Sequence, residues 1–301
     1  MHRRLKGQVI FVRALKFTQI MTSPRTLLSS INLYPKKKLG QNFLKDSQTS
    51  EMIINRCNLT AADTILEIGA GLGAMTIPAA RRVKKVYAVE MDQRIYGLLN
   101  SELLLSDISN VQVVQGNILT LPIKDFAEKA GRKIILLGNL PYNISSQILV
   151  KLIHERVYVD CAIIMLQKEM GMRIVAAPGS RDYGRLSVML KYCADIRRIA
   201  DLKATCFFPK PKVDSVVVEI KFRDSPREQA DDETLFFRTI KAAFSKRRKV
   251  LKNSLSGNIL NIDSQTAGRL LKKADIDPVR RAETLTVSDF VRLSNSIGRE
   301  R

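Results

Sequence analysis

Short apolar runs alternate with amphipathic stretches through the middle of the chain. The apolar runs have the length and residue types of β-strands and cover residues 64–68, 85–90, 111–115, 134–137, 161–166 and 215–221. Between them, residues 75–82, 94–105 and 145–155 repeat apolar positions with helical spacing. Strands that alternate with helices form βαβ units, so we expect an α/β fold with a mostly parallel sheet and helices on both faces.

The pattern becomes wholly helical after residue 233. One apolar stripe predicts a single long helix and consists of Phe237, Ile240, Phe244, Leu251 and Leu255. A second helix is expected to begin near Ser264 and a third near Ser288, which suits an N-cap. We therefore expect three parts: a basic, disordered extension over residues 1–36, a sheet domain over residues 37–223 and a small all-α domain over residues 224–301.

Composition narrows the class of protein. Of the 301 residues, 45% are apolar and 26% are charged, as in globular proteins. The four cysteines are widely spaced and form no CxxC pair, which argues against a disulfide framework and favours a reducing, cytoplasmic setting. The only histidines are His2 and His154, so we expect no metal site. No apolar run approaches the roughly 18 residues of a transmembrane helix, so no membrane partner is expected.

The charge is concentrated at the two ends of the chain, whose formal net charge is +21. Residues 1–45 hold ten Lys or Arg and no acidic residue, and residues 238–301 hold 15 basic and six acidic residues. Basic ends on a nearly neutral body favour contact with a polyanion such as a nucleic acid. A solvated basic surface is the alternative, and composition does not separate the two. Residues 1–36 also fit an organellar transit peptide, or a start of translation at Met21.

A glycine-rich loop follows the first predicted strand. Gly69, Gly71 and Gly73 have GxGxG spacing at the strand-to-helix turn, where glycine lets the backbone approach a ligand closely. No Lys-Ser/Thr pair follows, which excludes a P-loop. Glu90 ends the next strand, where a carboxylate can accept hydrogen bonds from both ribose hydroxyls of a nucleoside cofactor. A glycine turn needed only for packing is the alternative.

A second candidate loop, Asn-Leu-Pro-Tyr, follows the strand at residues 134–137. The side-chain oxygen of Asn139 and the carbonyl of Leu140 could accept both N–H groups of a nucleobase amine and so localise its lone pair. Pro141 would stiffen the loop, and Tyr142 offers a ring on which a flipped base can stack. The alternative is an ordinary Asn-Pro turn.

Together these motifs resemble a known family. In order along the chain the landmarks are GQNFL at 40–44, EIGAGLG at 67–73, NLPYNIS at 139–145, LQKE at 166–169, YGRLS at 183–187, FFPKPKVDS at 207–215, RRK at 247–249 and NSL at 253–255. From about residue 39 to residue 293 the chain is similar to the small-subunit (16S) ribosomal RNA adenine dimethyltransferases, of the bacterial kasugamycin-sensitivity type.

The resemblance implies a Rossmann-like class I methyltransferase domain that uses S-adenosylmethionine, together with a small helical rRNA-binding domain. The implied reaction is N6,N6-dimethylation of two adjacent adenosines in the 3′-terminal hairpin loop of the 16S rRNA. The expected partner is small-subunit rRNA or a pre-30S particle, bound by a monomer.

The resemblance also assigns roles by position. Asn42 and Leu44 would contact the methionine end of the cofactor, with Gly69 lying against it. Tyr142 and Phe207 would sandwich the flipped adenine. The other expected site residues are Gly71, Glu90 and Asn139 at the cofactor, Asn139 and Leu140 at the target amine, and Arg247, Arg248 and Lys249 at the RNA. For the last three, a solvated face is the alternative.

One position departs from the family pattern. Where the family usually carries Asp, bonded to the adenine amine of the cofactor, this chain has Asn117. An amide oxygen can still accept that bond, so we expect cofactor binding with some loss of affinity.

Two other functions stay open. A large-subunit rRNA dimethyltransferase is disfavoured by Leu140 and the PKPKVDS run, and a non-catalytic binding protein is disfavoured by the intact site residues.

Overall fold

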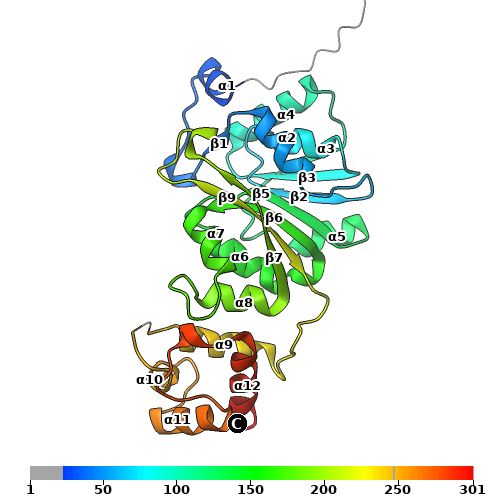
Figure 1. Ribbon diagram of the computed structural model, residues 1–301. Coiled ribbons are helices and arrows are strands. Elements are labelled where there is room, and N and C mark those ends of the chain that lie inside the picture. Colours follow the sequence, from blue (N-terminus) through cyan, green and yellow to red (C-terminus); the bar gives the residue numbers. More distant parts are fainter. Residues whose placement is uncertain (1–22, 247, 301) are drawn as a thin grey trace, which may run out of the picture.

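The structure is a computed structural model that describes residues 23–246 and 248–300. Within these residues, a seven-stranded sheet has the order β4–β3–β2–β5–β6–β9–β7 (Figure 1). The strands are β2 (Thr64–Ile68), β3 (Lys85–Glu90), β4 (Val111–Gln115), β5 (Ile134–Asn139), β6 (Val159–Gln167), β7 (Ala194–Leu202) and β9 (Ser215–Phe222). Every strand predicted from the apolar runs is present, and the predicted α/β class is confirmed.

The order of the strands creates a crevice at one edge of the sheet. Strands β4, β3, β2, β5 and β6 are parallel, whereas β9 pairs antiparallel with both β6 and β7. The chain moves outward from β2 through β3 to β4 and then returns to the other side of β2 with β5. Open α/β sheets bind ligands at such a reversal, outside the carboxyl ends of the strands. A separate antiparallel pair, β1 (Phe43–Leu44) and β8 (Phe207–Phe208), lies outside the main sheet.

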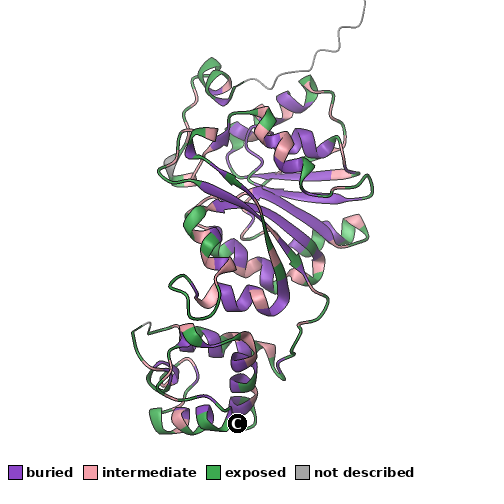
Figure 2. Cartoon of the chain, viewed as in Figure 1, coloured by how far each residue is buried: buried purple, intermediate pink, exposed green. Residues whose placement is uncertain are grey.

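Alternate side chains of the sheet belong to two cores. Leu66 and Ile68 pack on the face covered by α5, α6 and α8, whereas Ile65 packs on the face covered by α2, α3 and α4. Since successive residues of a strand point to opposite faces, a strand covered on both sides is apolar throughout. Figure 2 shows the inner strands buried along their length. The helices outside the C-terminal part are α1 (Pro24–Ser30), α2 (Ser47–Asn55), α3 (Thr76–Ala80), α4 (Gln93–Leu105), α5 (Ile123–Ala130), α6 (Ser145–His154), α7 (Lys168–Val175) and α8 (Arg185–Cys193). The disorder expected for residues 1–36 is wrong for residues 24–30, which form α1, and residues 1–22 lie outside the described residues.

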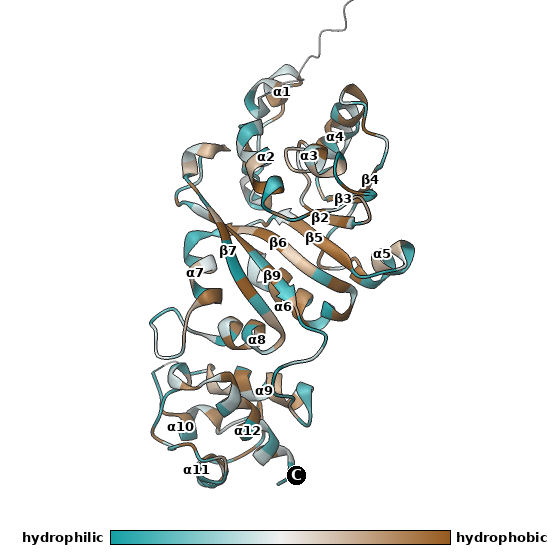
Figure 3. Ribbon diagram, turned by 45° about the vertical axis from the view of Figure 1, so that its right-hand side comes forward, coloured by the Kyte–Doolittle hydropathy of each residue, from teal (hydrophilic) through white to brown (hydrophobic). Residues whose placement is uncertain are grey.

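The outer strand β7 is a strand that the sequence pattern does not predict. It has a neighbour on one side only, and its Asp195, Arg197 and Arg198 side chains are exposed. The register with β9 also shifts between Arg198 and Ala200, which breaks the two-residue alternation that identifies a strand. Figure 3 shows hydrophilic segments along β7, whereas the inner strand β5 is hydrophobic.

Four described helices form the C-terminal part: α9 (Glu233–Ala243), α10 (Leu251–Leu255), α11 (Ser264–Lys273) and α12 (Val287–Gly298). Their buried side chains, among them Phe236 and Phe290, belong to the same core as one face of the sheet. The hydroxyl of Tyr183 also donates to the carbonyl of Leu285 at 2.9 Å. The helical part therefore packs directly on the sheet domain.

The single long helix predicted to include both Phe237 and Leu255 is wrong, because α9 and α10 are separate helices. The backbone N–H of Leu251 donates to the carbonyl of Arg280 at 2.8 Å. The ammonium of Lys246 donates to the carbonyl of Asn253 at 3.1 Å. Since α9 ends at Ala243 and α10 begins at Leu251, the basic run SKRRK belongs to the connection between the two helices.

The helix starts near residues 264 and 288 have different outcomes. α11 begins at Ser264, as predicted. α12 begins at Val287, next to the predicted start, but its N-cap is Thr286, so the assignment of the cap to Ser288 is wrong. The Thr286 hydroxyl accepts the Asp289 backbone N–H at 3.1 Å, and the Asp289 carboxylate accepts the Thr286 N–H at 2.9 Å. This reciprocal capping box satisfies two backbone donors, whereas a cap at Ser288 would satisfy one.

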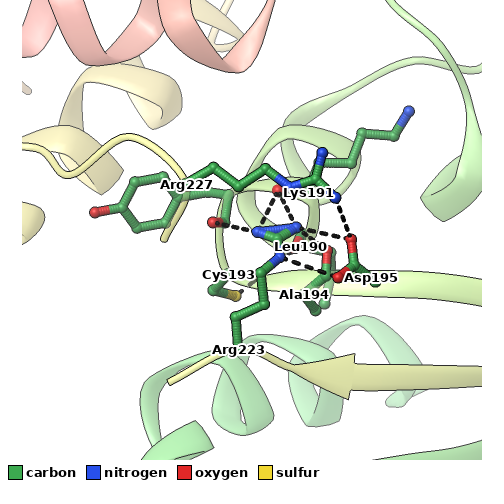
Figure 4. Close-up of polar contacts among 8 residues, drawn as sticks. Leu190, Lys191, Cys193, Ala194, Asp195, Arg223 and Arg227 are labelled. Carbon is green, nitrogen blue, oxygen red and sulfur yellow. Dashed lines mark hydrogen bonds and ion pairs between the residues drawn. The ribbon is translucent and has the colours of Figure 1, made fainter. Parts of the chain in front are cut away.

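Arg223 fastens the end of β9 to the junction between α8 and β7 (Figure 4). Its guanidinium donates to the carbonyls of Lys191 at 3.1 Å, Tyr192 at 3.2 Å and Ala194 at 2.6 Å. It also forms an ion pair with the Asp195 carboxylate at 3.2 Å. The last carbonyls of a helix lack partners within the helix and favour a cation, which explains why one arginine makes so many bonds here.

We expect Arg223→Ala to lower the free energy of unfolding by about 2–3 kcal/mol, because several carbonyls lose their donor together. Arg223→Lys should recover only part of this loss, since an ammonium cannot reach all the acceptors of a planar guanidinium. Urea unfolding followed by circular dichroism measures the difference. Arg227→Ala is the control: this exposed side chain also bonds Asp195, at 3.1 Å, but no helix end. Equal losses in the two variants would contradict the role of Arg223.

Candidate functional site

A cavity of about 270 Å³ opens at the carboxyl ends of β2, β3 and β5. Its walls include Asn42 from the segment before β1, Gly69 after β2, Glu90 at the end of β3 and Asn139 at the end of β5. Asn117, which follows β4, lies on the same cavity. The structure thus brings together residues that lie far apart in the sequence. Leu44 and Gly71 line a smaller adjoining cavity, together with Gly69 and Asn139.

The three glycines of the loop after β2 differ in how much space surrounds them. All have positive φ, at 70° for Gly69, 57° for Gly71 and 86° for Gly73. An added Cβ would lie 3.1 Å from the Phe43 ring at Gly71 and 3.0 Å from the Leu99 side chain at Gly73, so a side chain at either position would require these neighbours to shift. At Gly69 the Cβ would have one described neighbour within 4 Å, the backbone oxygen of Asn139 at 3.8 Å. Packing therefore disfavours a side chain at Gly71 and Gly73, whereas Gly69 has room beside its backbone, and both Gly69 and Gly71 line the main cavity.

Glu90 connects the glycine loop to the end of β3. Its Oε2 accepts the Gly71 backbone N–H at 3.0 Å, and its Oε1 accepts the Asp92 backbone N–H at 2.8 Å. Burial raises the pKa of the Glu90 carboxyl, and these two backbone bonds oppose the rise. Because a carboxylate oxygen accepts more than one hydrogen bond, Glu90 can hold the loop and bind ribose hydroxyls at the same time.

Asn139 ends β5 with its side chain held in place. Its Nδ2 donates to the backbone carbonyl of Asn42 at 2.8 Å, which leaves Oδ1 as the acceptor. The next residue, Leu140, has a buried side chain, and its backbone N–H donates to the carbonyl of Met165 at 3.1 Å. The backbone on both sides of the predicted amine-binding oxygens is therefore fixed by the sheet.

Tyr142 and Phe207, predicted to sandwich the adenine, are placed differently. Tyr142 is half-buried, and its hydroxyl lies 3.0 Å from the Ser215 hydroxyl at the start of β9. Phe207 is 1% exposed, and its register partner in the β1–β8 pair is Leu44. Its ring lies in the core in this structure, so a base could stack on it only after the pair moves. The stacking role of Phe207 stays a prediction.

The sequence analysis assigns no role to Gln41 and Met91, which line the cavity, or to Asp92, which follows Met91. Met91 follows Glu90, is 54% exposed and gives the cavity an apolar wall for a base. Gln41 donates to the Asp92 carboxylate at 3.2 Å, and the pKa of that carboxyl is held well below its usual range by Arg94 first and by Gln41 as well. Adjacency to Glu90 is the one signal in the sequence that could have identified Met91 and Asp92.

Glu67, at the start of the glycine motif, also escapes the sequence analysis. It is 1% exposed and lines the smaller cavity, and its Oε2 has no hydrogen-bond partner in the described part of the chain. Burial raises the pKa of this carboxyl to about 8; the nearby carboxylate of Glu90 adds to the rise, and the Thr76 hydroxyl opposes it. An unpaired buried acceptor beside a glycine cradle suits a ligand with a cationic end. The residues present therefore fit the expected cofactor, S-adenosylmethionine.

Glu67 predicts a dependence of stability on pH. Between its ordinary pKa of 4.5 and its folded-state pKa of about 8, the folded chain holds a proton that the unfolded chain has lost. Its stabilising contribution is therefore complete below the ordinary pKa and is lost as pH rises through the folded one. Glu67→Gln stays neutral, so its Tm relative to the original chain should rise from about pH 5 to about pH 8 and then level off. Calorimetry without cofactor measures this difference, and a difference independent of pH would exclude the raised pKa.

Asn117 lines the main cavity and also forms a turn, because its Oδ1 accepts the Leu119 backbone N–H at 3.0 Å. A second lone pair of that oxygen stays available for an adenine amine. Asn117→Asp should keep the turn and bind S-adenosylmethionine about 3- to 10-fold more tightly, since an ionised acceptor makes the stronger bond. Titration calorimetry measures the affinity. Binding that is unchanged or weaker would contradict this assignment.

The basic residues predicted to bind RNA lie apart from the cavity. Arg248 and Lys249 are exposed in the connection between α9 and α10, and neither lines the cavity. Arg247 lies outside the described residues. In residues 23–246 and 248–300, no group of His, Cys, Asp and Glu side chains could hold a metal ion. No helix in the same ranges is long and apolar enough to cross a membrane.

Comparisons with known proteins point to one family. A model of the family described as ribosomal RNA adenine dimethylase matches residues 33–297. The ribosomal RNA small subunit methyltransferase A of Desulforapulum autotrophicum is 48% identical over 277 residues, which are 92% of this chain and 97% of that protein. The crystal structure of a dimethyladenosine transferase from Plasmodium falciparum has a TM-score of 0.71 and 26% identity, over 83% of this chain and 95% of that one. The 23S rRNA methyltransferase ErmE, at 23% identity and a TM-score of 0.62 over 85% of this chain and 99% of that one, shares the fold.

Proposed function

The chain belongs to the ribosomal RNA adenine dimethylase family, and from this premise we propose that it dimethylates adenosine N6 in small-subunit rRNA with S-adenosylmethionine. The target is two adjacent adenosines in the 3′-terminal hairpin loop of the 16S rRNA. The observation that carries the proposal is the position of Asn139. Its amide nitrogen is held by the Asn42 carbonyl at 2.8 Å, so its Oδ1 is presented at the edge of the sheet where β2 and β5 diverge.

The residues around the cavity hold the cofactor at both ends. When bound, S-adenosylmethionine supplies an electrophilic methyl group on a sulfonium sulfur. Glu90 accepts hydrogen bonds from the ribose hydroxyls, and Asn117 accepts one from the adenine amine. Asn42, Leu44 and Gly69 contact the methionine end. Because Gly69, Glu90 and Asn117 stand at the ends of three separate strands of one sheet, they fix the cofactor relative to the loop after β5.

The loop after β5 prepares the acceptor nitrogen. The exocyclic amine of adenine is a weak nucleophile because its lone pair is delocalised into the ring. Asn139 Oδ1 and the Leu140 carbonyl accept its two N–H groups, which localises the lone pair and orients it toward the cofactor. Tyr142 stacks on one face of the flipped base and, once the β1–β8 pair has moved, Phe207 stacks on the other. The bond between the hydroxyls of Tyr142 and Ser215 supports this arrangement, since it holds the tyrosine ring beside the loop.

The basic ends of the chain bind the rRNA backbone. We assign methyl transfer to residues 37–223 and rRNA binding to residues 224–301, with residues 1–36 as a basic extension. Arg247, Arg248 and Lys249 contact phosphates, which position an RNA without reading its sequence. The enzyme acts as a cytoplasmic monomer on small-subunit rRNA or on a pre-30S particle.

Mass spectrometry of methylated rRNA tests the proposal against both alternatives. Small-subunit and large-subunit rRNA lacking the modification are incubated separately with the protein and S-adenosylmethionine, and the digested fragments are analysed. We expect dimethyladenosine in the 3′-terminal fragment of the small-subunit rRNA. Dimethyladenosine confined to large-subunit rRNA would identify the other enzyme class. Binding of rRNA without any methylation would identify a non-catalytic binding protein.

A further inference from the structure

A short helix precedes the part of the chain that the family model covers. α1 spans Pro24–Ser30, whereas the matched region begins at residue 33. Ser23 caps this helix, because its hydroxyl oxygen accepts the Thr26 backbone N–H at 3.2 Å. A helix of seven residues is not stable in water on its own. Packing against the rest of the molecule must therefore hold α1 in place.

Leu28 provides that packing. It is 2% exposed, whereas Ile31, directly after the helix, is 46% exposed. Leu28 forms an apolar cluster with Phe43, Leu72 and Ile95, and this cluster is separate from the two cores of the sheet. The attachment of α1 thus depends on a small group of side chains and not on the main cores.

Two members of this cluster are also walls of the proposed cofactor site. Phe43 lines both cavities, and Leu72 lines the smaller one. The Phe43 ring lies against the glycine loop, since an added Cβ on Gly71 would be 3.1 Å from it. Each of these two side chains therefore belongs both to the cluster that holds α1 and to the cavity wall.

The segment that follows α1 runs along the rim of the main cavity. The ammonium of Lys36 pairs with the Asp92 carboxylate at 3.3 Å. The backbone N–H of Lys36 donates to Gln41 Oε1 at 2.7 Å. The Lys38 carbonyl accepts the Asn143 side-chain N–H at 3.4 Å. Residues 33–42 thus join α1 to the loops after β3 and β5. Displacement of α1 would loosen the rim as well as the wall.

We propose that α1 anchors one wall of the cofactor cavity and that Leu28 is a positioning residue for cofactor binding. The inference rests on the proposed function, because it takes this cavity as the site of S-adenosylmethionine. With Leu28 docked, Phe43 is held against the glycine loop. With Leu28 undocked, Phe43 loses its support and residues 33–42 are free to leave the rim. The cofactor binds the docked state, so its apparent Kd is the intrinsic Kd divided by the docked fraction.

The size of the expected effect follows from this relation. Leu28→Ala removes most of a buried side chain and should weaken docking about 100-fold. If the undocked state of the original chain has a population of about 10%, the docked fraction of the variant falls to about one tenth. The apparent Kd then rises about tenfold. Ile31→Ala removes an apolar side chain that is already exposed and should change nothing.

The test uses the full chain and S-adenosylhomocysteine as the probe. Titration calorimetry should show a Kd about tenfold higher in Leu28→Ala, and methylation assays should show an equal rise in KM for S-adenosylmethionine with kcat unchanged. Leu28→Met, which conserves volume, should bind like the original chain. The Tm of the cofactor-free protein should stay nearly the same in all variants, because the cluster is separate from the main cores.

An unchanged Kd in Leu28→Ala, or an equal rise in Ile31→Ala, would overturn the inference. Global unfolding of Leu28→Ala without cofactor would overturn it too, because Leu28 would then support the whole fold. A fall in kcat at an unchanged KM would place Leu28 at the chemical step and not at binding. Failure of the proposed function is distinguishable from all of these, since the original chain itself would then neither bind S-adenosylhomocysteine nor methylate rRNA.

Discussion

Replacing Asn139 by alanine should lower the rate of adenine dimethylation at saturating cofactor by about 10²- to 10³-fold, close to background. The variant loses the side-chain oxygen that accepts an N–H of the target amine, so the lone pair stays delocalised. It also loses the bond to the Asn42 carbonyl, 2.8 Å long, that holds the side chain in place. Single-turnover methylation of small-subunit rRNA, followed by mass spectrometry, measures the rate.

Asn139→Asp separates the two contributions of this side chain. An aspartate keeps acceptor oxygens for the amine but cannot donate to the Asn42 carbonyl, so we expect a rate between those of the original chain and the alanine variant. Binding of rRNA, measured by filter retention, should be unchanged in both variants. Turnover of Asn139→Ala near that of the original chain would exclude Asn139 as the residue that orients the amine.

Replacing Glu90 by glutamine should weaken S-adenosylmethionine binding about 100-fold. The carboxylate now accepts backbone N–H groups on both oxygens, from Gly71 at 3.0 Å and from Asp92 at 2.8 Å. A glutamine must turn its amide NH₂ toward one of these donors, which leaves two donors facing each other. The variant therefore loses an ionised acceptor for the ribose and also disturbs the glycine loop. Titration calorimetry measures the change in Kd.

Glu102→Gln is the matched control for Glu90→Gln. Glu102 lies on α4, is also buried, has a pKa raised by burial alone, and does not line the cavity. The same chemical change there should leave the Kd within about twofold. Equal losses of affinity in the two variants would show that a general effect of removing a buried carboxylate, and not contact with the cofactor, explains the result.

The inner strands and the outer strand β7 show which strands the hydrophobic pattern can identify and which it cannot. β2 and β5 are mostly apolar because both of their faces are buried, so the pattern identifies them. β7 has exposed charges and a shift in its register, so its alternation is broken. In the tail, the periodicity of residues 237–255 is real, but a bond from the Leu251 N–H to the Arg280 carbonyl divides the helix in two. Periodicity along the chain carries no information about such a distant partner.

The residues of the candidate site also divide into those that the sequence identifies and those that it does not. Gly69, Glu90 and Asn139 are recognisable because each stands at the carboxyl end of a predicted strand, and parallel strands bring those ends to one edge. Glu67 and Leu28 are not recognisable in this way. One is a carboxylate inside an apolar strand, and the other is an ordinary leucine in a short helix ahead of the motifs. Glu67 is important because its Oε2 has no partner in the described residues and lies beside the smaller cavity. Leu28 is important because its apolar cluster includes residues of the cavity wall.

The sequence by itself determined the α/β class, the inner strands and the family, because these depend on local periodicity and on motifs of fixed spacing. Only the tertiary structure decided that the basic run lies between two helices, that Phe207 lies in the core, that Asn139 is held by the Asn42 carbonyl and that α1 rests against the cavity wall. The physical reason is that burial and hydrogen-bond partners are set by residues distant along the chain, whose approach depends on how the whole molecule packs.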